Sequence, residues 1–241
     1  MFNKYFEVIL ADTEESKKAH YSIRYQVYCE EMGFENKDNF PDQMEHDEYD
    51  DSSVHFIVRD KISGQWLGAM RLIYKQDSLL PIEQSCKLKA KIGYSEFSGA
   101  VELSRLCLIK EARKGIKDID PPHGIDANSN LTLDSDKIKS LPQRNKLNRM
   151  IIWGLFYAAA EYCSVNNMPH VYFMTTAALA RIMRRGGLNL MDIGDSCMHK
   201  GERFPFKMNA IETYQNKMWK GYQEGYQVFS KWKVAQIAEA A

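Results

Sequence analysis

Three charged side chains stand inside stretches of sequence that are otherwise apolar. Arg71 lies within residues 65–74, and Glu102 and Arg105 lie within residues 100–109. Charged side chains are rarely buried unless they are paired. Glu102 and Arg105 differ in parity, so a regular strand would point them to opposite faces of a sheet, whereas a bulge between them would bring both to one side. We therefore expect a break in this strand with a polar site beside it.

Other charges in the first fifty residues could join these three. Arg24 lies late in a helical pattern, and an acidic loop, Met-Glu-His-Asp-Glu-Tyr-Asp, follows at residues 44–50. A carboxylate in reach of an amine can take up its proton, and an arginine can hold a carboxylate with two hydrogen bonds. The same charges could instead form a structural ion-pair network. Both interpretations stay open for the set Arg24, Asp47, Asp50, Arg71, Glu102 and Arg105.

Metal chemistry is not indicated by the histidines or cysteines. Neither His46 nor His55 has a partner at metal-ligand spacing, and no Cys pair or Cys/His cluster has zinc spacing. We interpret the five cysteines as small buried apolar groups in a reducing, cytoplasmic protein. They are Cys29, Cys86, Cys107, Cys163 and Cys197.

Composition favours one soluble globular domain over residues 1–241. The chain has 32 Lys and Arg against 32 Asp and Glu, so no overall field attracts nucleic acid, and no basic stripe is interleaved with aromatic residues. The first residues lack the apolar segment of a signal peptide, and the longest apolar stretch, 150–160, is short for a membrane span. We expect a monomer.

Helical and strand patterns alternate along the chain, which indicates an α/β fold, an α+β sandwich with a central sheet covered on both faces. An Asp12 and Glu15 capping pair starts the first predicted helix. Residues 112–145 are predicted to be a long insertion, and 236–241 a frayed tail. Strands are expected at 54–58, 65–74, 100–109, 170–175, 188–198 and 202–209, and helices at 12–32, 81–92, 146–166, 177–185 and from about 211 onward.

The acidic loop at 44–50, the Met-Arg-Leu at 70–72 and the Glu-Leu-Ser-Arg at 102–105 resemble the acyl-homoserine lactone (autoinducer) synthase family. They resemble still more its relatives, the N-acyl amino acid synthases and the PEP-CTERM/exosortase-associated acyltransferases. The likeness runs from about residue 21 to 110, and more loosely to about 210. It implies a GNAT-like acyl-CoA N-acyltransferase fold with a splayed mixed sheet. The implied co-substrate is acyl-carrier protein or acyl-CoA, whose arm lies between the strands at 100–109 and 170–175, with no metal and no permanently bound cofactor.

Carried over residue by residue, the likeness matches the same six charged positions. Two departures bear on the acceptor: Phe34 follows Gly33 where the lactone synthases have a tryptophan beside their adenosylmethionine site, and Tyr28 replaces a phenylalanine. Residues 113–118 hold only a fragment of the usual GNAT pyrophosphate loop, which argues against plain acetyl-CoA. These departures favour a free amino acid or another small amine as acceptor.

The chemistry of amide formation suggests roles for the candidates. Glu102 would accept the amine proton, and the backbone of Ser104, Arg105, Leu106 and Cys107 would lie beside the thioester and stabilise the oxyanion. Arg71 and Arg105 would hold a carboxylate or the acidic loop. The acyl chain would run along Phe156, Tyr172 and Met174, although such a stripe is more often plain core.

A carrier protein is acidic, so its docking surface should be basic. Two clusters of cations would meet at one end of such a sheet, and the alternative is an ordinary solvated surface. They are Lys110, Arg113, Lys114 and Lys117, and Arg144, Lys146 and Arg149.

Two other functions remain open. The first is an acyl-homoserine lactone synthase that uses S-adenosylmethionine, against which Phe34 counts. The second is a non-catalytic module that binds acyl groups or carrier protein.

Overall fold

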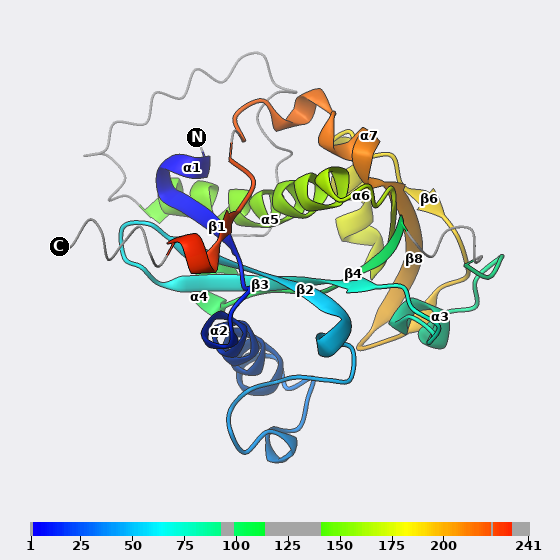
Figure 1. Ribbon diagram of the computed structural model, residues 1–241, viewed down its shortest axis with the longest axis horizontal. Coiled ribbons are helices and arrows are strands. Elements are labelled where there is room, and N and C mark those ends of the chain that lie inside the picture. The colour runs from blue at the N-terminus through cyan, green and yellow to red at the C-terminus, as the bar shows by residue number, and fades with distance from the viewer. Residues whose placement is uncertain (1, 93–98, 114–140, 223, 233–241) are drawn as a thin grey trace.

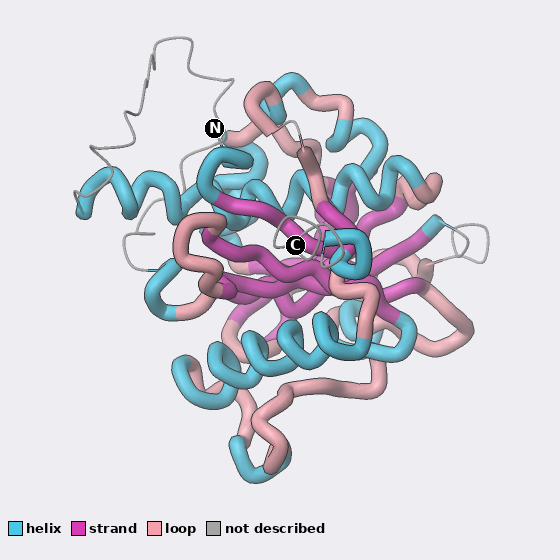
Figure 2. Tube along the Cα trace, turned by 60° about the vertical axis from the view of Figure 1, so that its left-hand side comes forward, coloured by secondary structure: helices cyan, strands magenta, loops and turns pink. Residues whose placement is uncertain are grey.

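In the computed structural model, a central mixed sheet separates two layers of helices (Figures 1 and 2). The structure describes residues 2–92, 99–113, 141–222 and 224–232, with the side chains of 141–149 excluded. In these residues the strands follow the order β6-β8-β5-β4-β3-β2-β1-β9, and β7 pairs with β8. This arrangement confirms the predicted α/β fold with a sheet covered on both faces.

Most strands lie where the hydrophobic pattern predicts them. The predicted strand at 188–198 is instead two short strands, β6 and β7, and two further strands at the ends of the chain were not predicted. One of these, β9, has two residues and exists only through parallel pairing with β1. The strands are β1 Phe6–Leu10, β2 Ser53–Asp60, β3 Trp66–Tyr74, β4 Ala100–Leu108, β5 His170–Thr175, β6 Met191–Asp192, β7 Cys197–Met198, β8 Glu202–Asn209 and β9 Gln227–Val228.

The helices differ from the predictions mainly at their ends. Thr13 and Ser16 form the capping box of α2, and Asp12 instead accepts hydrogen bonds from Ser230, so the predicted capping pair is wrong. A π-helical segment, Gln26–Glu31, continues α2. The helix predicted at 81–92 shrinks to one turn. The helices are α1 Phe2–Tyr5, α2 Glu14–Tyr25, α3 Pro81–Ser85, α4 Lys110–Arg113, α5 Leu141–Val165, α6 Ala177–Arg185 and α7 Ala210–Tyr214.

Helix α5 is apolar on nearly all sides because other elements cover both its inner and its outer side. It packs on β1, β2 and β3, while α1 and α7 cover its outer side (Figure 1). The predicted amphipathic helix from residue 211 is wrong: α7 ends at Tyr214 and an irregular segment follows. That segment supplies Trp219, whose ring packs against Trp153 of α5. The apolar tail pattern therefore reflects burial against α5 in an irregular conformation.

Strands β4 and β5 separate part of the way along their length. Their parallel pairing ends at Glu102 and Tyr172, while β5 continues alongside β8 to Thr175. On the other side of β4, Ala69 faces Cys107 and Arg71 faces Ser104, so β4 has one residue more than β3 in this interval. Arg105 has a φ of 52°. A bulge is thus present in β4, but it lies at Arg105 and Leu106, whereas the sequence predicted it between Glu102 and Arg105.

The pairing of β3 with β4 is tight enough to exclude a methyl group at Gly68. A Cβ there would lie 2.4 Å from Leu108 Cδ2 and 2.6 Å from the main-chain oxygen of Cys107. We expect Gly68→Ala to lower the free energy of unfolding by about 1–3 kcal/mol because the backbone must shift. Urea denaturation measures this, with exposed Gln65→Ala as the control. Equal urea midpoints for both variants and the wild type would contradict the packing described.

Candidate active site where two strands separate

A cavity of about 300 Å³ occupies the gap between β4 and β5. One part of its wall is apolar and includes residues from α5 and α6. The other part is polar and includes residues from the segment after α2, from β4 and from the β7–β8 hairpin. The apolar residues are Phe34, Leu103, Leu106, Phe156, Phe173, Met174, Leu179 and Met183, and the polar residues are Tyr28, Glu35, Glu102, Ser104, Arg105, Thr175, Thr176, His199, Lys200 and Arg203.

Glu102 is the carboxyl group in the deepest part of this wall. Its side chain is 1% exposed, and its Oε2 accepts a hydrogen bond of 2.9 Å from the main-chain N–H of Ile82 in α3. Burial raises the pKa of Glu102 to about 8, although the Ile82 N–H and the charge of Arg71 oppose the shift. A carboxyl group with a pKa near working pH can both accept and return a proton. Glu102 thus has the properties of a general base.

The remaining charges form a separate group, which we call the buried ion cluster. Arg24 pairs with Glu45 and with Asp50, the latter at 2.6 Å. Arg71 pairs with Asp47 and Asp50, and Arg105 pairs with Glu45 and Asp47. Three guanidinium groups therefore face three carboxylates. The members of the buried ion cluster are Arg24, Glu45, Asp47, Asp50, Arg71 and Arg105.

The cluster corrects part of the predicted site. In the described residues Glu102 makes no ion pair with the cluster, and Glu45, which the sequence analysis did not single out, takes its place. Arg24, Asp50 and Arg71 are buried and do not line the cavity, so substrate binding by these three is not supported. Asp47 and Arg105 keep side chains 18% and 21% exposed. The structural interpretation of the charges therefore applies to most of the set.

Electrostatics in the cluster favour the ionised carboxylates. Burial disfavours the charge of Asp50, but Arg24 and Arg71 outweigh it and hold the pKa of this carboxyl well below its ordinary value. Burial also lowers the pKa of His55 to about 4, so this imidazole is neutral at pH 7. The ring of His20 lies 4.6 Å from that of His55, and burial lowers its pKa as well. Both histidines pack against the cluster and away from the cavity.

The predicted acyl-binding and thioester residues divide between cavity and core. Phe34, Leu106, Phe156 and Met174 line the cavity. Tyr172 and Cys107 are buried outside it, which corrects their predicted contact with substrate. Burial raises the pKa of the Cys107 thiol to about 12, so it is not a ready nucleophile.

The predicted carrier-protein residues are described only in part. Lys110 is exposed at the start of α4, just after β4. Arg113 is already paired with Glu31. Lys114 and Lys117 lie outside the described residues, as do the side chains of Arg144, Lys146 and Arg149. The basic docking surface therefore stays a prediction.

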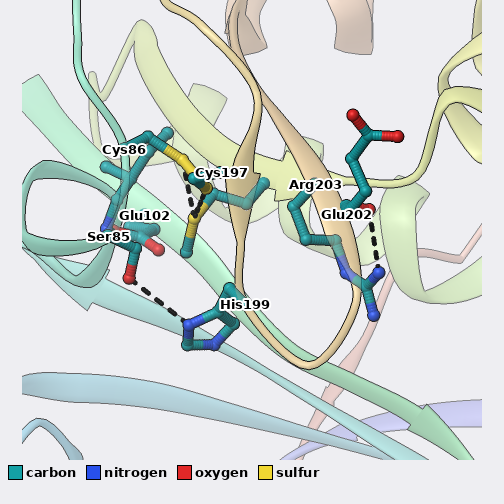
Figure 3. Close-up of a disulfide and its surroundings, with 9 residues drawn as sticks. Ser85, Cys86, Glu102, Cys197, His199, Glu202 and Arg203 are labelled. Atoms are coloured by element: carbon teal, nitrogen blue, oxygen red, sulfur yellow. Dashed lines mark hydrogen bonds between the residues drawn. A yellow bond between two sulfur atoms is a disulfide. The ribbon is translucent and has the colours of Figure 1, made fainter.

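A disulfide between Cys86 and Cys197 corrects the interpretation of the cysteines (Figure 3). It joins the end of α3 to β7 across 111 residues of sequence. Cys29, Cys107 and Cys163 are free and buried, as predicted. Disulfides are typical of oxidising compartments, so the cysteines no longer support a reducing environment, and a cytoplasmic location stays a prediction.

In the part of the chain that the structure describes, no three His, Cys, Asp or Glu side chains gather closely enough to hold a metal ion. None of the helices that can be described is long and apolar enough to cross a membrane.

Several cavity residues were missed in the sequence. Leu179 and Met183 have the spacing of one helix face, which a closer reading of α6 could have found. The rim residues His199, Lys200 and Arg203 had no such signal, because only the tertiary fold brings the β7–β8 hairpin to the cavity. Lys200 reaches the segment after α2, where it pairs with Glu35 at 3.2 Å and donates to the main-chain oxygen of Phe34.

Comparison with known proteins defines the class of this site. Residues 23–117 match the family described as acetyltransferase (GNAT) domain. The matched segment contains Glu102, the bulge of β4 and the whole buried ion cluster. The sheet with its parted strands is the GNAT-like fold expected from the resemblance, and the match over residues 23–117 supports an acyltransferase.

Solved structures share the fold along nearly the whole chain. A CoA-dependent acyl-homoserine lactone synthase, BjaI, in complex with MTA has a TM-score of 0.60 at 13% identity, covering 93% of this chain and 92% of that one. TofI, in a ternary complex with an inhibitor and MTA, has a TM-score of 0.58 at 19% identity, and the match covers 85% of this chain and 91% of TofI. The AHL synthase LasI has a TM-score of 0.56 at 17% identity, and the match covers 92% of this chain and 97% of LasI. No curated protein matches the sequence.

The buried ion cluster should contribute far more to stability than a surface pair of the same type. Arg71→Met leaves the three carboxylates of the cluster with only Arg24 and Arg105, so one negative charge is uncompensated and we expect a loss of about 3–5 kcal/mol. Arg184 pairs with Asp192 at 2.7 Å, but these side chains are 43% and 59% exposed. Arg184→Met should cost only about 0–1 kcal/mol. Chemical denaturation compares the two, and similar losses would contradict the larger contribution of the buried ion cluster to stability.

Proposed function

We propose that this protein is an N-acyltransferase that moves a long-chain fatty acyl group from a thioester carrier to the amine of an amino acid or a similar small acceptor. The carrier is acyl-carrier protein or coenzyme A. One observation carries the proposal: a buried carboxyl group with a raised pKa shares a cavity with an apolar slot, at the point where β4 loses its strand partner.

The reaction uses the gap between the strands. The acceptor amine attacks the thioester carbonyl carbon, and its proton passes to Glu102 directly or through a water molecule. The C–S bond then breaks, and the leaving sulfur takes up a proton as the thiol. Beyond Glu102, the edge of β4 that faces β5 is free of strand pairing, so those main-chain N–H groups of residues 103–106 that point toward β5 are available for the oxyanion. Ser104 and Arg105 line the cavity at this position.

The apolar slot supports a long acyl chain over an acetyl group. Phe156 comes from α5, whereas Leu179 and Met183 come from α6, so the slot lies between the sheet and these helices. Each buried CH₂ group contributes about 0.8 kcal/mol of binding. Acyl chains that fill the slot would therefore bind more tightly than acetyl.

Mass spectrometry of lipid extracts tests this function. Cells that overproduce the protein should accumulate an N-acyl amino acid or related amide that cells with Glu102→Gln lack. An acyl-homoserine lactone would instead indicate adenosylmethionine as the acceptor. Acyl binding without any new product would indicate a non-catalytic module.

Removal of the base should cut turnover while the fold stays intact. We expect Glu102→Gln to lower kcat/KM by about 10²–10⁴-fold, the usual contribution of general base catalysis. Release of the carrier thiol measures this, and exposed Glu48→Gln serves as the control. If Glu102→Gln keeps near wild-type activity, the base lies elsewhere.

The pH dependence has a defined direction. Glu102 loses its proton as pH rises through about 8, so wild-type kcat/KM should rise with pH and level off above that value. The fold disfavours the charged form, because its pKa lies above the ordinary value of 4.5. The stability gained from the neutral carboxyl is thus lost as pH rises from 4.5 to about 8. Thermal unfolding at pH 9 should show Glu102→Gln at least as stable as wild type.

An acidic carrier protein as donor makes a separate prediction. Lys110→Glu should raise KM for an acyl-carrier-protein donor several-fold and change KM for acyl-CoA less, because only the carrier has an extended acidic surface. Lys18→Glu, exposed on α2, is the matched control. Added salt should weaken binding of the carrier protein in wild type. Salt-insensitive binding with equal effects of the two substitutions would count against this docking surface. The exosortase association and the monomeric state stay predictions.

A further inference from the structure

We propose that the acceptor carries a carboxylate and that Arg203, on the β7–β8 hairpin, binds it. The inference rests on the proposed acyl transfer to an amine and narrows its substrate class. It follows from the balance of charges around the cavity, from the position of the hairpin and from the disulfide that holds the hairpin in place.

The other charges that line the cavity are already compensated. Arg105 is held by Glu45 and Asp47, and Lys200 pairs with Glu35. Glu102 is mostly neutral near pH 7, because burial raises its pKa to about 8. None of these groups therefore provides a free negative charge that could neutralise another cation at the cavity.

Arg203 is the exception. Its Nη1 donates to the main-chain oxygen of Glu202 at 3.0 Å, and its Nη2 donates to that of Lys200 at 2.9 Å. Neither oxygen is charged, and in the described part of the chain no carboxylate pairs with this guanidinium. The Glu202 carboxylate is directed away from it (Figure 3). A half-buried arginine with only main-chain partners can hold an anion with its charge and its remaining donors.

The hairpin places this charge on the acceptor side. The apolar slot involves α5 and α6, on the face of the sheet opposite α2 (Figure 1). The hairpin instead reaches the segment after α2, because Lys200 bonds to Phe34 and Glu35. An acceptor held by Arg203 would thus approach the thioester from the side away from the acyl chain.

The disulfide links this anion site to the base. Cys86 ends α3, the turn whose Ile82 N–H holds Glu102, and Cys197 begins the hairpin that holds Arg203 (Figure 3). His199 lies between Cys197 and Arg203 in sequence and adds a polar group to the hairpin. Burial and the neighbouring cations lower the pKa of His199, which favours its neutral form, and its Nδ1 lies 3.3 Å from Ser85 Oγ. A rigid link between base and anion site fits an acceptor with an amine and a carboxylate at fixed separation.

A substrate pair that differs only in charge tests the proposal. Wild-type protein is supplied with palmitoyl-CoA and an equimolar pool of the twenty amino acids, and in parallel with the pool of their carboxamides. Mass spectrometry measures the N-acyl products. We expect amino acids to be acylated about 10- to 100-fold better than carboxamides, the range that one charge-assisted hydrogen bond provides.

Variants assign the preference to one residue. Arg203→Gln should remove it by raising KM for the amino acid about 10- to 100-fold with little change in KM for palmitoyl-CoA. Arg203→Lys, which keeps the charge, should restore part of it. Arg181→Gln, exposed on α6, should leave it unchanged.

Each contrary result has a distinct meaning. Equal acylation of both pools by wild type, or an unchanged preference in Arg203→Gln, overturns the carboxylate site and leaves the acyltransferase function standing. A rise confined to KM for palmitoyl-CoA overturns it in favour of a phosphate of the donor. Absence of product from both pools, with palmitoyl-CoA and with palmitoyl-acyl-carrier protein as donors, removes the proposed function, and this inference with it.

Discussion

The ion pairs from Arg105 to Glu45 and Asp47 maintain the break in β4 on which the site depends. A non-glycine residue with positive φ costs of order 1 kcal/mol, and it persists where surrounding contacts hold it. Here the contacts come from an acidic loop that Arg24 and Arg71 fix in turn. The bulge then turns Arg105 toward the cavity and leaves the edge of β4 free for a ligand. A regular β4 would close the gap with β5.

The balance of the buried ion cluster also explains why Glu102 can act differently from the other carboxyl groups. The cluster uses its three arginines on its own three carboxylates, so Asp50 stays ionised while Glu102, one strand away, receives little compensation for burial. Two groups of similar chemistry are thereby separated into a structural anion and a proton acceptor. Such a separation of pKa values by environment is the usual basis of acid–base roles in one site.

The local sequence pattern was sufficient to predict the strands and the helix that hold most of the candidate site. The alternation of β4, the limits of β5 and α6, and the presence of a bulge in β4 follow from nearest neighbours in sequence, whereas the position of the bulge, at Arg105 and Leu106, does not. Glu45 and Arg203 do not, because a charge in a loop or hairpin has no periodicity that reveals its partner. Strand β9 and the Cys86–Cys197 disulfide depend on residues more than a hundred positions away. The sequence therefore predicted β4 better than the loop and hairpin that surround it.

This division follows the boundary of the family match. Residues 23–117 contain the proposed base, the bulge and the buried ion cluster. The apolar slot depends on Phe156, Leu179 and Met183, and the acceptor side depends on the β7–β8 hairpin, all beyond that boundary. Changes in the later part could alter acyl length or acceptor without disturbing the charges that hold β4. Under the proposed function, the elements that pack against β4 would therefore determine specificity, and β4 itself would determine the chemistry.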